Sequence, residues 1–123
     1  MHMTVGTDIT EVERIQKIIE AHPEFIATVF TEHEIAYCQR KKNKYQHFAA
    51  RFAAKESVMK AVGKGWLQGL QWTDIEVEAL PSGEPKIKAR GTLLRAMDEK
   101  KITSFAVSLS HCKAYALATV IAI

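Results

Sequence analysis

The spacing of apolar residues predicts a chain that alternates between strands and helices. Over residues 4–9 apolar and polar side chains alternate with a period of two, which predicts a strand with Asp8 facing away from Val5. Over residues 11–22 apolar residues return every three or four positions, which predicts an amphipathic helix that ends at Pro23. One face of this helix is therefore expected in the core, and the other is free for contact.

Two capping motifs mark the starts of helices. Thr10 with Glu13, and Thr31 with Glu34, have the spacing in which the two side chains cap the first backbone N–H groups of a helix. The first pair predicts that Thr10 caps the helix described above. The second pair predicts another helix over residues 32–40.

The longest helix is expected over residues 46–62, which contain no Gly or Pro and several alanines. Phe48 and Met59 belong to one apolar stripe along it, with Lys55 near the edge of the stripe. Gly63 is expected to end the helix in the left-handed conformation.

The rest of the chain predicts short strands and one more helix. The strands are expected over residues 73–79, 86–89, 105–110 and 115–123, a turn over 81–85, and a helix over 92–98. The last strand is apolar on both faces, which predicts a central position or cover by another subunit. Hairpins with separated helices indicate a single α+β domain, residues 1–123, with a small antiparallel sheet and a long packed helix.

Composition adds little about partners. The 123 residues include 17 Lys and Arg against 14 Asp and Glu, and this mild excess of +3 suits a phosphate-bearing or acidic partner. Cys38 and Cys112 fit no disulfide framework or paired metal-ligand spacing, which favours free thiols in a reducing cytoplasm. No apolar stretch is long enough to cross a membrane and no signal peptide is visible, so we expect a cytoplasmic protein without membrane contact.

A basic run offers one alternative function. Residues 40–44 carry four positive charges and no apolar anchor, which is typical of a solvated loop. Together with Lys64, the run could instead serve a small non-enzymatic nucleic-acid binder. Such a protein needs aromatic platforms beside the charges, and only Tyr37, Tyr45 and Phe48 are close in the sequence.

Glu56 and Lys60 are four residues apart on the long helix and therefore share a face. They fit a surface ion pair. They also fit a polyphosphate site, in which Lys60 acts with the turn Gly63-Lys64-Gly65 at the helix end. The turn is not a Walker loop, because the chain lacks the earlier glycine and the following Ser or Thr.

Asp8 and His111 each allow two interpretations as well. Asp8 could interact with the dipole of the helix that follows, or it could join Glu56 in a half-open oxygen site suited to Mg²⁺. His111, at the end of a strand, could be a structural hydrogen bonder or a catalyst whose partner the spacing does not reveal.

These pieces together resemble the bacterial holo-acyl-carrier-protein synthases, the short 4′-phosphopantetheinyl transferases of fatty acid synthesis. The similar segments are GTDITEVERI at 6–15, RFAAKESVMKAVGKG at 51–65, DIEV at 74–77, GEP at 83–85 and SLSH at 108–111. Their order and spacing agree with the family over almost the whole chain. Lys64 stands where the family more often has Thr, and the first helix has fewer Arg than some members.

The resemblance implies a homotrimer whose sites lie between adjacent subunits. It implies that Asp8 and Glu56 hold Mg²⁺, and that Glu56 and Lys60 are catalytic, with Lys60 at the pyrophosphate of coenzyme A. The residues implied around coenzyme A are Arg51, Lys60, Gly63, Lys64, Gly65, Gly83, Pro85 and His111.

The implied reaction is attack by a serine hydroxyl of an apo-acyl carrier protein on the β-phosphate of coenzyme A, which releases adenosine 3′,5′-bisphosphate. The base is Glu56 or a metal-bound water. Arg14 and Lys17, one turn apart on the solvent face of the first helix, are expected to dock the acidic carrier protein. A coenzyme A-binding regulator without transfer activity is a further alternative, although both carboxylates and Lys60 are present.

Overall fold

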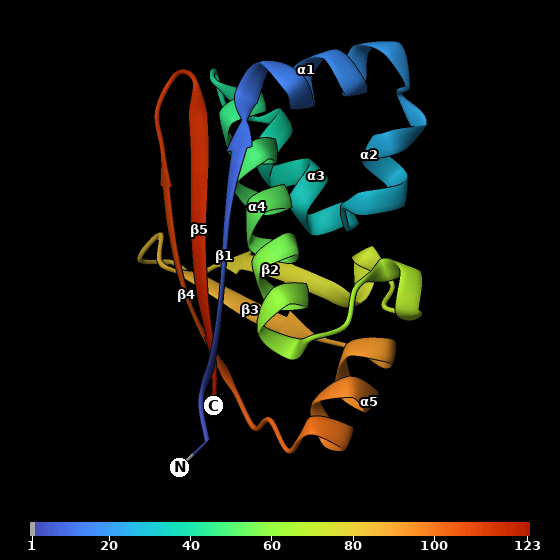
Figure 1. The fold of residues 1–123 in the computed structure, drawn as a ribbon. Coiled ribbons are helices and arrows are strands. Elements are labelled where there is room, and N and C mark those ends of the chain that lie inside the picture. Colours follow the sequence, from blue (N-terminus) through green and yellow to red (C-terminus); the bar gives the residue numbers. More distant parts are fainter. Residues whose placement is uncertain (1) are drawn as a thin grey trace.

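The computed structural model describes residues 2–123 (Figure 1). Its elements are β1 (Thr4–Glu11), α1 (Val12–Ala21), α2 (Glu24–Val29), α3 (Glu32–Gln39), α4 (Lys44–Val62), β2 (Ile75–Ala79), β3 (Pro85–Ala89), α5 (Gly91–Lys100), β4 (Phe105–His111) and β5 (Tyr115–Ala122), with short 3₁₀ turns η1 (Trp66–Gln68) and η2 (Trp72–Asp74). Every expected strand and helix is present, with ends that differ by a few residues. The short helix α2 is an addition that the apolar pattern did not predict.

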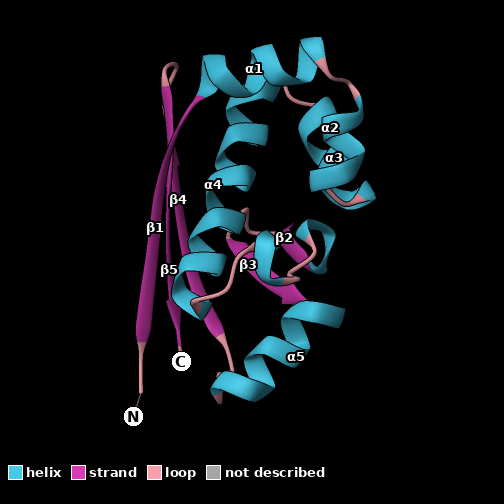
Figure 2. Cartoon of the chain, turned by 45° about the vertical axis from the view of Figure 1, so that its right-hand side comes forward, coloured by secondary structure: helices cyan, strands magenta, loops and turns pink. Residues whose placement is uncertain are grey.

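The strands form two antiparallel sheets, and the α+β expectation is confirmed. The larger sheet has the order β1-β5-β4, so the last strand is central, as its apolar character predicts. Strands β2 and β3 form a separate hairpin. Helix α4 lies between the larger sheet and the helices α1, α2 and α3 (Figure 2). The site discussed below is built where α4 meets β1.

Two buried apolar clusters meet on α4, which explains its few exposed positions. Its N-terminal half packs under α1, α2 and α3, where the rings of Phe30 and Phe48 lie 5.0 Å apart. Its C-terminal half, with Val58 and Met59, packs on the larger sheet, the β2–β3 hairpin and α5. The helix ends at Gly63, whose φ of 81° is left-handed as expected.

Gly6 allows β1 to lie directly on α4. A Cβ atom at this position would lie 1.9 Å from the carbonyl oxygen of Ser57, so the close approach excludes every other residue. Asp8 and Thr10 share the inward side of β1 with Gly6, because side chains alternate along a strand.

The outer face of the larger sheet carries large apolar side chains exposed to solvent. Val5, Ile9, Tyr115, Leu117 and Ile121 lie on β1 and β5, and Val5 and Ile9 are 65% and 66% exposed. A contiguous apolar face on a sheet is typical of a surface that another subunit covers. Among residues 2–123, no helix combines the length and the hydropathy that crossing a membrane requires.

The capping expectation is wrong for the first helix and confirmed for the third. Strand β1 continues to Glu11, which pairs with Tyr115, so Thr10 lies inside the strand and cannot cap α1. Its hydroxyl instead donates to Oδ2 of Asp8 at 2.7 Å. Thr31 and Glu34 form the complete capping box of α3.

Buried charges account for two further corrections. Lys55 does not lie at the edge of the apolar stripe, because it is wholly buried and its ammonium lies 2.8 Å from Oε1 of Glu34. Glu76 alternates with the apolar residues Ile75 and Val77, a pattern that predicts an exposed side chain, but it is 2% exposed and pairs with Arg90 at 3.1 Å. The first pair joins α4 to α3, and the second joins β2 to the residue before α5. Periodicity alone cannot anticipate such buried partners.

Candidate active site

Three polar side chains from two elements converge where β1 crosses α4. The ammonium of Lys60 donates to Oδ1 of Asp8 at 3.2 Å and to the carbonyl oxygen of Thr7 at 2.9 Å. Glu56 lies one turn before Lys60 on the same face of α4. Lys60 is thus paired with the strand carboxylate, and the interpretation of Glu56 and Lys60 as an isolated surface pair is wrong.

Asp8 is close enough to Glu56 to affect the ionisation of the Glu56 carboxyl. Partial burial raises the pKa of the Glu56 carboxyl, and the negative charge of Asp8 raises it further. The positive charges of Lys60 and Arg14 oppose this rise. Two neighbouring carboxylates are a donor set that Mg²⁺ accepts, because this ion binds few protein carboxylates and completes its shell with water and phosphate oxygens. Within residues 2–123 no cluster of three or more His, Cys, Asp or Glu side chains could hold a metal.

A cavity of about 290 Å³ opens beside Glu56 and Lys60. It is lined by Glu56, Met59, Lys60, Gly63, Lys64, Gly65, Trp66, Leu67 and Gln68. The ammonium of Lys64 is held 2.6 Å from Oε2 of Glu99, and it keeps the pKa of that carboxyl below its ordinary value. The structure therefore brings together Lys60 and the glycine turn, as the sequence predicts.

Arg51 and His111 belong to a second cluster at the other end of α4. Arg51 is 4% exposed and stacks on Tyr37, with its guanidinium carbon 4.1 Å from the ring centre. Nδ1 of His111 lies 2.8 Å from Oε1 of Gln46, and its ring lies 4.9 Å from that of His47. Within residues 2–123, Nε of Arg51 is a buried side-chain nitrogen without a hydrogen-bond partner.

His47 and Tyr37 are members of this cluster that the sequence did not single out. Burial lowers the pKa of His47 to about 4, and the positive charge of Arg51 adds to the effect. His47 is one turn before Arg51 on α4, and this spacing was the signal that could have found it.

Gly83 and Pro85 lie on the β2–β3 hairpin, on the side of the Arg51 cluster. Pro85 pairs with Ala79, and Ala79 shares a cavity of about 240 Å³ with Tyr37. Gly83 has a left-handed φ of 89° in the turn. The predicted coenzyme A residues thus form two groups on one chain, and Arg51 and Lys60 are separated by roughly 14 Å along the axis of α4.

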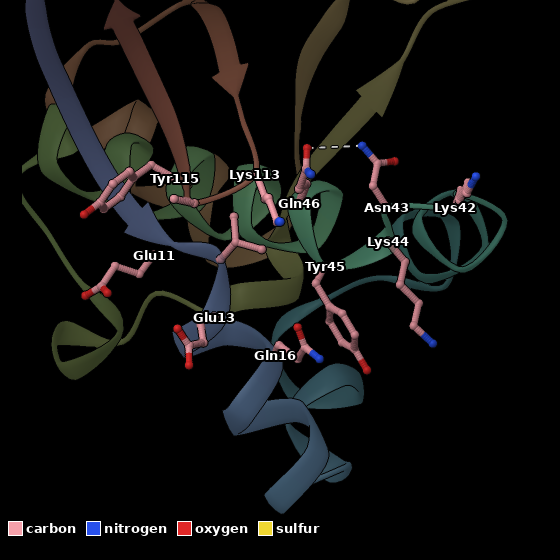
Figure 3. Close-up of a pocket in the computed structure, with 12 residues that line it drawn as sticks. Glu11, Glu13, Gln16, Lys42, Asn43, Lys44, Tyr45, Gln46, Lys113 and Tyr115 are labelled. Atoms are coloured by element: carbon pink, nitrogen blue, oxygen red, sulfur yellow. Dashed lines mark hydrogen bonds between the residues drawn. The ribbon is translucent and has the colours of Figure 1, made fainter.

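The basic run lies beside another cavity, of about 660 Å³ (Figure 3). Its lining comes from the end of β1, the starts of α1 and α4 and the β4–β5 turn, and it does not include Asp8. Figure 3 shows Lys42, Lys44 and Lys113 around the same opening as Glu11 and Glu13. Because the lining carries charges of both signs, it attracts a polyanion less strongly than the run of basic residues suggests.

Arg14 and Lys17 are both exposed on α1, as expected, but they are not equivalent. Lys17 is paired with Glu13 at 3.0 Å. Arg14 takes part in no ion pair within residues 2–123, and it is close enough to Glu56 to lower the pKa of that carboxyl. The positive field of α1 therefore comes mainly from Arg14.

Comparison with known proteins places this geometry in a family. The profile of the 4′-phosphopantetheinyl transferase superfamily matches residues 4–120. The holo-[acyl-carrier-protein] synthase of Solibacter usitatus is 43% identical, covering 98% of this chain and 98% of the relative. That of Caldanaerobacter subterraneus subsp. tengcongensis is 42% identical over 100% of this chain and 96% of the relative.

Solved structures agree with the sequence relatives. The holo-[acyl-carrier-protein] synthase of Neisseria meningitidis superposes with a TM-score of 0.88 at 27% identity, covering 98% of this chain and 97% of that one. The Helicobacter pylori synthase in complex with coenzyme A superposes with a TM-score of 0.85 at 29% identity, covering 97% and 99%. Because profile, relatives and structures all span nearly the whole chain, it belongs to the 4′-phosphopantetheinyl transferase superfamily.

Proposed function

We propose that this chain transfers 4′-phosphopantetheine from coenzyme A to a serine of an apo-acyl carrier protein, as a holo-acyl-carrier-protein synthase. The observation that carries the proposal is the convergence of Asp8, Glu56 and Lys60 beside a cavity. Support comes from the relatives, which are holo-[acyl-carrier-protein] synthases, and from the Helicobacter pylori synthase, whose structure contains coenzyme A.

In this proposal Asp8 and Glu56 hold Mg²⁺. Burial and the negative charge of Asp8 both raise the pKa of Glu56, and a bound cation relieves the second of these effects, so the donor set fits the ion. When bound, Mg²⁺ neutralises charge on the phosphate oxygens of coenzyme A.

The chain's own residues then act on the two substrates. Lys60 exchanges part of its pairing with Asp8 for the pyrophosphate and stabilises the charge that grows on the leaving phosphate. The serine oxygen forms a bond to the β-phosphorus, and the bond from this phosphorus to the bridging oxygen breaks. Glu56 receives the serine proton, directly or through one water. Adenosine 3′,5′-bisphosphate leaves.

The proposal includes a homotrimer with sites between subunits. The exposed apolar outer face of the larger sheet supports association, since it is otherwise left in water. Arg51 is too far from Lys60, at roughly 14 Å along the axis of α4, for both to bind the same phosphate in one chain. A neighbouring subunit therefore supplies Arg51, His111, Gly83 and Pro85 to the coenzyme A bound at Lys60, Gly63, Lys64 and Gly65.

We place the carrier protein over the exposed face of α1, where Arg14 lies near Glu56. Carrier proteins are acidic, so the cation guides the serine toward the phosphate. The free thiols of Cys38 and Cys112 fit action in the reducing cytoplasm.

Transfer is tested by incubating the protein with coenzyme A, Mg²⁺ and an apo-acyl carrier protein, followed by mass spectrometry of the carrier. A mass increment of one phosphopantetheine is expected. Binding of coenzyme A without the increment would identify a regulator, and binding of nucleic acid in its place would revive the alternative based on residues 40–44.

The intersubunit site is tested by mixing two inactive variants, Asp8→Ala and His111→Ala. Subunit exchange between them creates some sites with both halves intact, so activity should return in the mixture. Mixtures that stay inactive although mass measurements detect mixed trimers would contradict the shared site.

A further inference from the structure

The cavity beside Glu56 and Lys60 has a lining that combines charged and apolar side chains. Glu56 and Lys60 supply charged groups from α4. Met59, Trp66 and Leu67 supply apolar lining. Trp66 and Leu67 are 55% and 77% exposed, although neither belongs to the apolar outer face of the sheet. Two adjacent large apolar side chains left in water beside a reactive centre indicate contact with a ligand.

The charges around the cavity indicate which half of coenzyme A the cavity can bind. Coenzyme A has a charged half, with adenosine and the 3′-phosphate, and an uncharged half, the pantetheine arm. Lys64 is the other cation on the lining, and Glu99 neutralises it at 2.6 Å. The apolar part of the lining therefore offers little to a phosphate. It suits the uncharged arm, whose first carbon is the CH2 group of the phosphate ester and whose second carbon bears two methyl groups.

We propose that Met59, Trp66 and Leu67 bind the dimethyl end of the pantetheine arm, so that Trp66 and Leu67 orient the donor at Lys60. This inference rests on the proposed transfer function and names the part of the substrate that the cavity takes. The turn η1, between Gly65 and Gly69, holds both side chains at the opening. Burial of the two methyl groups fixes the direction of the phosphate ester relative to Lys60, and correct orientation speeds the attack of serine.

The test compares two ligands that differ by the phosphopantetheine group, which is the arm together with the β-phosphate. Calorimetry with Mg²⁺ measures the binding of coenzyme A and of adenosine 3′,5′-bisphosphate to the full chain and to Trp66→Ala and Leu67→Ala. Trp66→Ala should weaken coenzyme A binding about tenfold, the size expected when contacts to two methyl groups are lost. Its affinity for adenosine 3′,5′-bisphosphate should change less than about twofold. Leu67→Ala should show the same selectivity with a smaller loss.

Leu94→Ala is the matched control, because Leu94 is 53% exposed on α5 and does not line the cavity. It should affect neither ligand. A coenzyme A analogue without the two methyl groups should bind the full chain and Trp66→Ala with equal affinity, and this arm tests the methyl contact directly.

Three results would overturn the inference. Equal weakening of both ligands would place the adenosine half in the cavity. Unchanged coenzyme A binding with a raised KM for the carrier protein would make Trp66 and Leu67 a protein-docking surface. Unchanged values throughout would leave them without a role in binding. If the full chain binds coenzyme A but does not modify any carrier protein, the proposed function fails. The ligand comparison then still shows which part of coenzyme A the cavity binds.

Discussion

The ammonium of Lys60 lies 3.2 Å from Oδ1 of Asp8, so an ion pair joins α4 to β1 at the proposed metal site. Thr10 also donates to Oδ2 of this carboxylate, at 2.7 Å. Both oxygens of Asp8 are therefore oriented before any ligand binds. Preorganised charges lose little free energy to rearrangement during the reaction.

Removing either carboxylate charge should abolish transfer. Asp8→Asn and Glu56→Gln keep the size of each side chain, so the fold should survive, while the negative charge that holds Mg²⁺ is lost. Transfer rates measured against Mg²⁺ concentration should show no activity in either variant, and chelation of Mg²⁺ should stop the unmodified protein. Glu20→Gln, an exposed carboxylate on α1, is the control. Near-normal turnover of Asp8→Asn or Glu56→Gln would disprove the metal assignment.

Lys60→Ala should lower the rate tens-fold or more. Loss of a cation at the pyrophosphate removes at least about 2 kcal/mol of transition-state stabilisation. Rapid-quench measurement of transfer at saturating substrates isolates this effect from binding. Lys100→Ala, which removes an exposed lysine of α5, should be neutral. A decrease in the transfer rate of less than about threefold for Lys60→Ala would show that Lys60 is only a structural partner of Asp8.

The local parts of this site could be predicted from the sequence, but their partners could not. Helical spacing placed Glu56, Lys60 and Gly63 on one end of α4, and strand alternation turned Asp8 away from Val5. Periodicity is a local property, so it carries no information on which strand crosses which helix. The pairing of Asp8 with Lys60, 52 positions apart, arises only from tertiary packing.

The same limit explains the failed cap and the buried lysine. A capping box competes with strand pairing, and at Thr10 the pairing of β1 with β5 extends to Glu11 and prevails. Helical periodicity predicts that a lysine such as Lys55 lies outside the core, but Glu34 from α3 neutralises its charge inside the core. Helical spacing links His47 to Arg51 on α4, but it cannot predict that His111, 60 positions after Arg51, contacts His47 and Gln46.

Gly6→Ala should destabilise the protein and displace Asp8. The added methyl group would lie 1.9 Å from the Ser57 oxygen, so β1 must move away from α4. We expect a loss of about 3 kcal/mol or more in the free energy of unfolding, together with a fall in kcat. Gly83→Ala is the comparison, because its methyl meets nothing within 4 Å and only the φ of 89° costs about 1–2 kcal/mol. Equal losses in urea unfolding would contradict the contact.

Lys55→Met should cost about 3–5 kcal/mol of unfolding free energy, because it leaves the buried Glu34 carboxylate without its cation. Adding Glu34→Gln removes the unpaired charge, so the double variant should be more stable than the sum of the single effects by about 1–3 kcal/mol. Urea unfolding of the four proteins in this double-mutant cycle measures the coupling. If the losses of unfolding free energy in the two single variants add up to the loss in the double variant, the charges of Lys55 and Glu34 are not coupled in stability.

Arg14 and Lys17 should differ in their effect on carrier docking, although they lie one turn apart on α1. Glu13 neutralises Lys17 at 3.0 Å, while Arg14 faces the site without such a partner within residues 2–123. Arg14→Glu should therefore raise the KM for the carrier protein more than Lys17→Glu does, and leave the KM for coenzyme A nearly unchanged. It should also weaken the salt dependence, since attraction between exposed charges is screened over about 10 Å at 0.1 M salt. Kinetics at low and high salt, with each substrate varied in turn, provide the test. An equal rise in both KM values would assign Arg14 to the fold or the coenzyme site, and the docking surface would then be sought at residues 40–44.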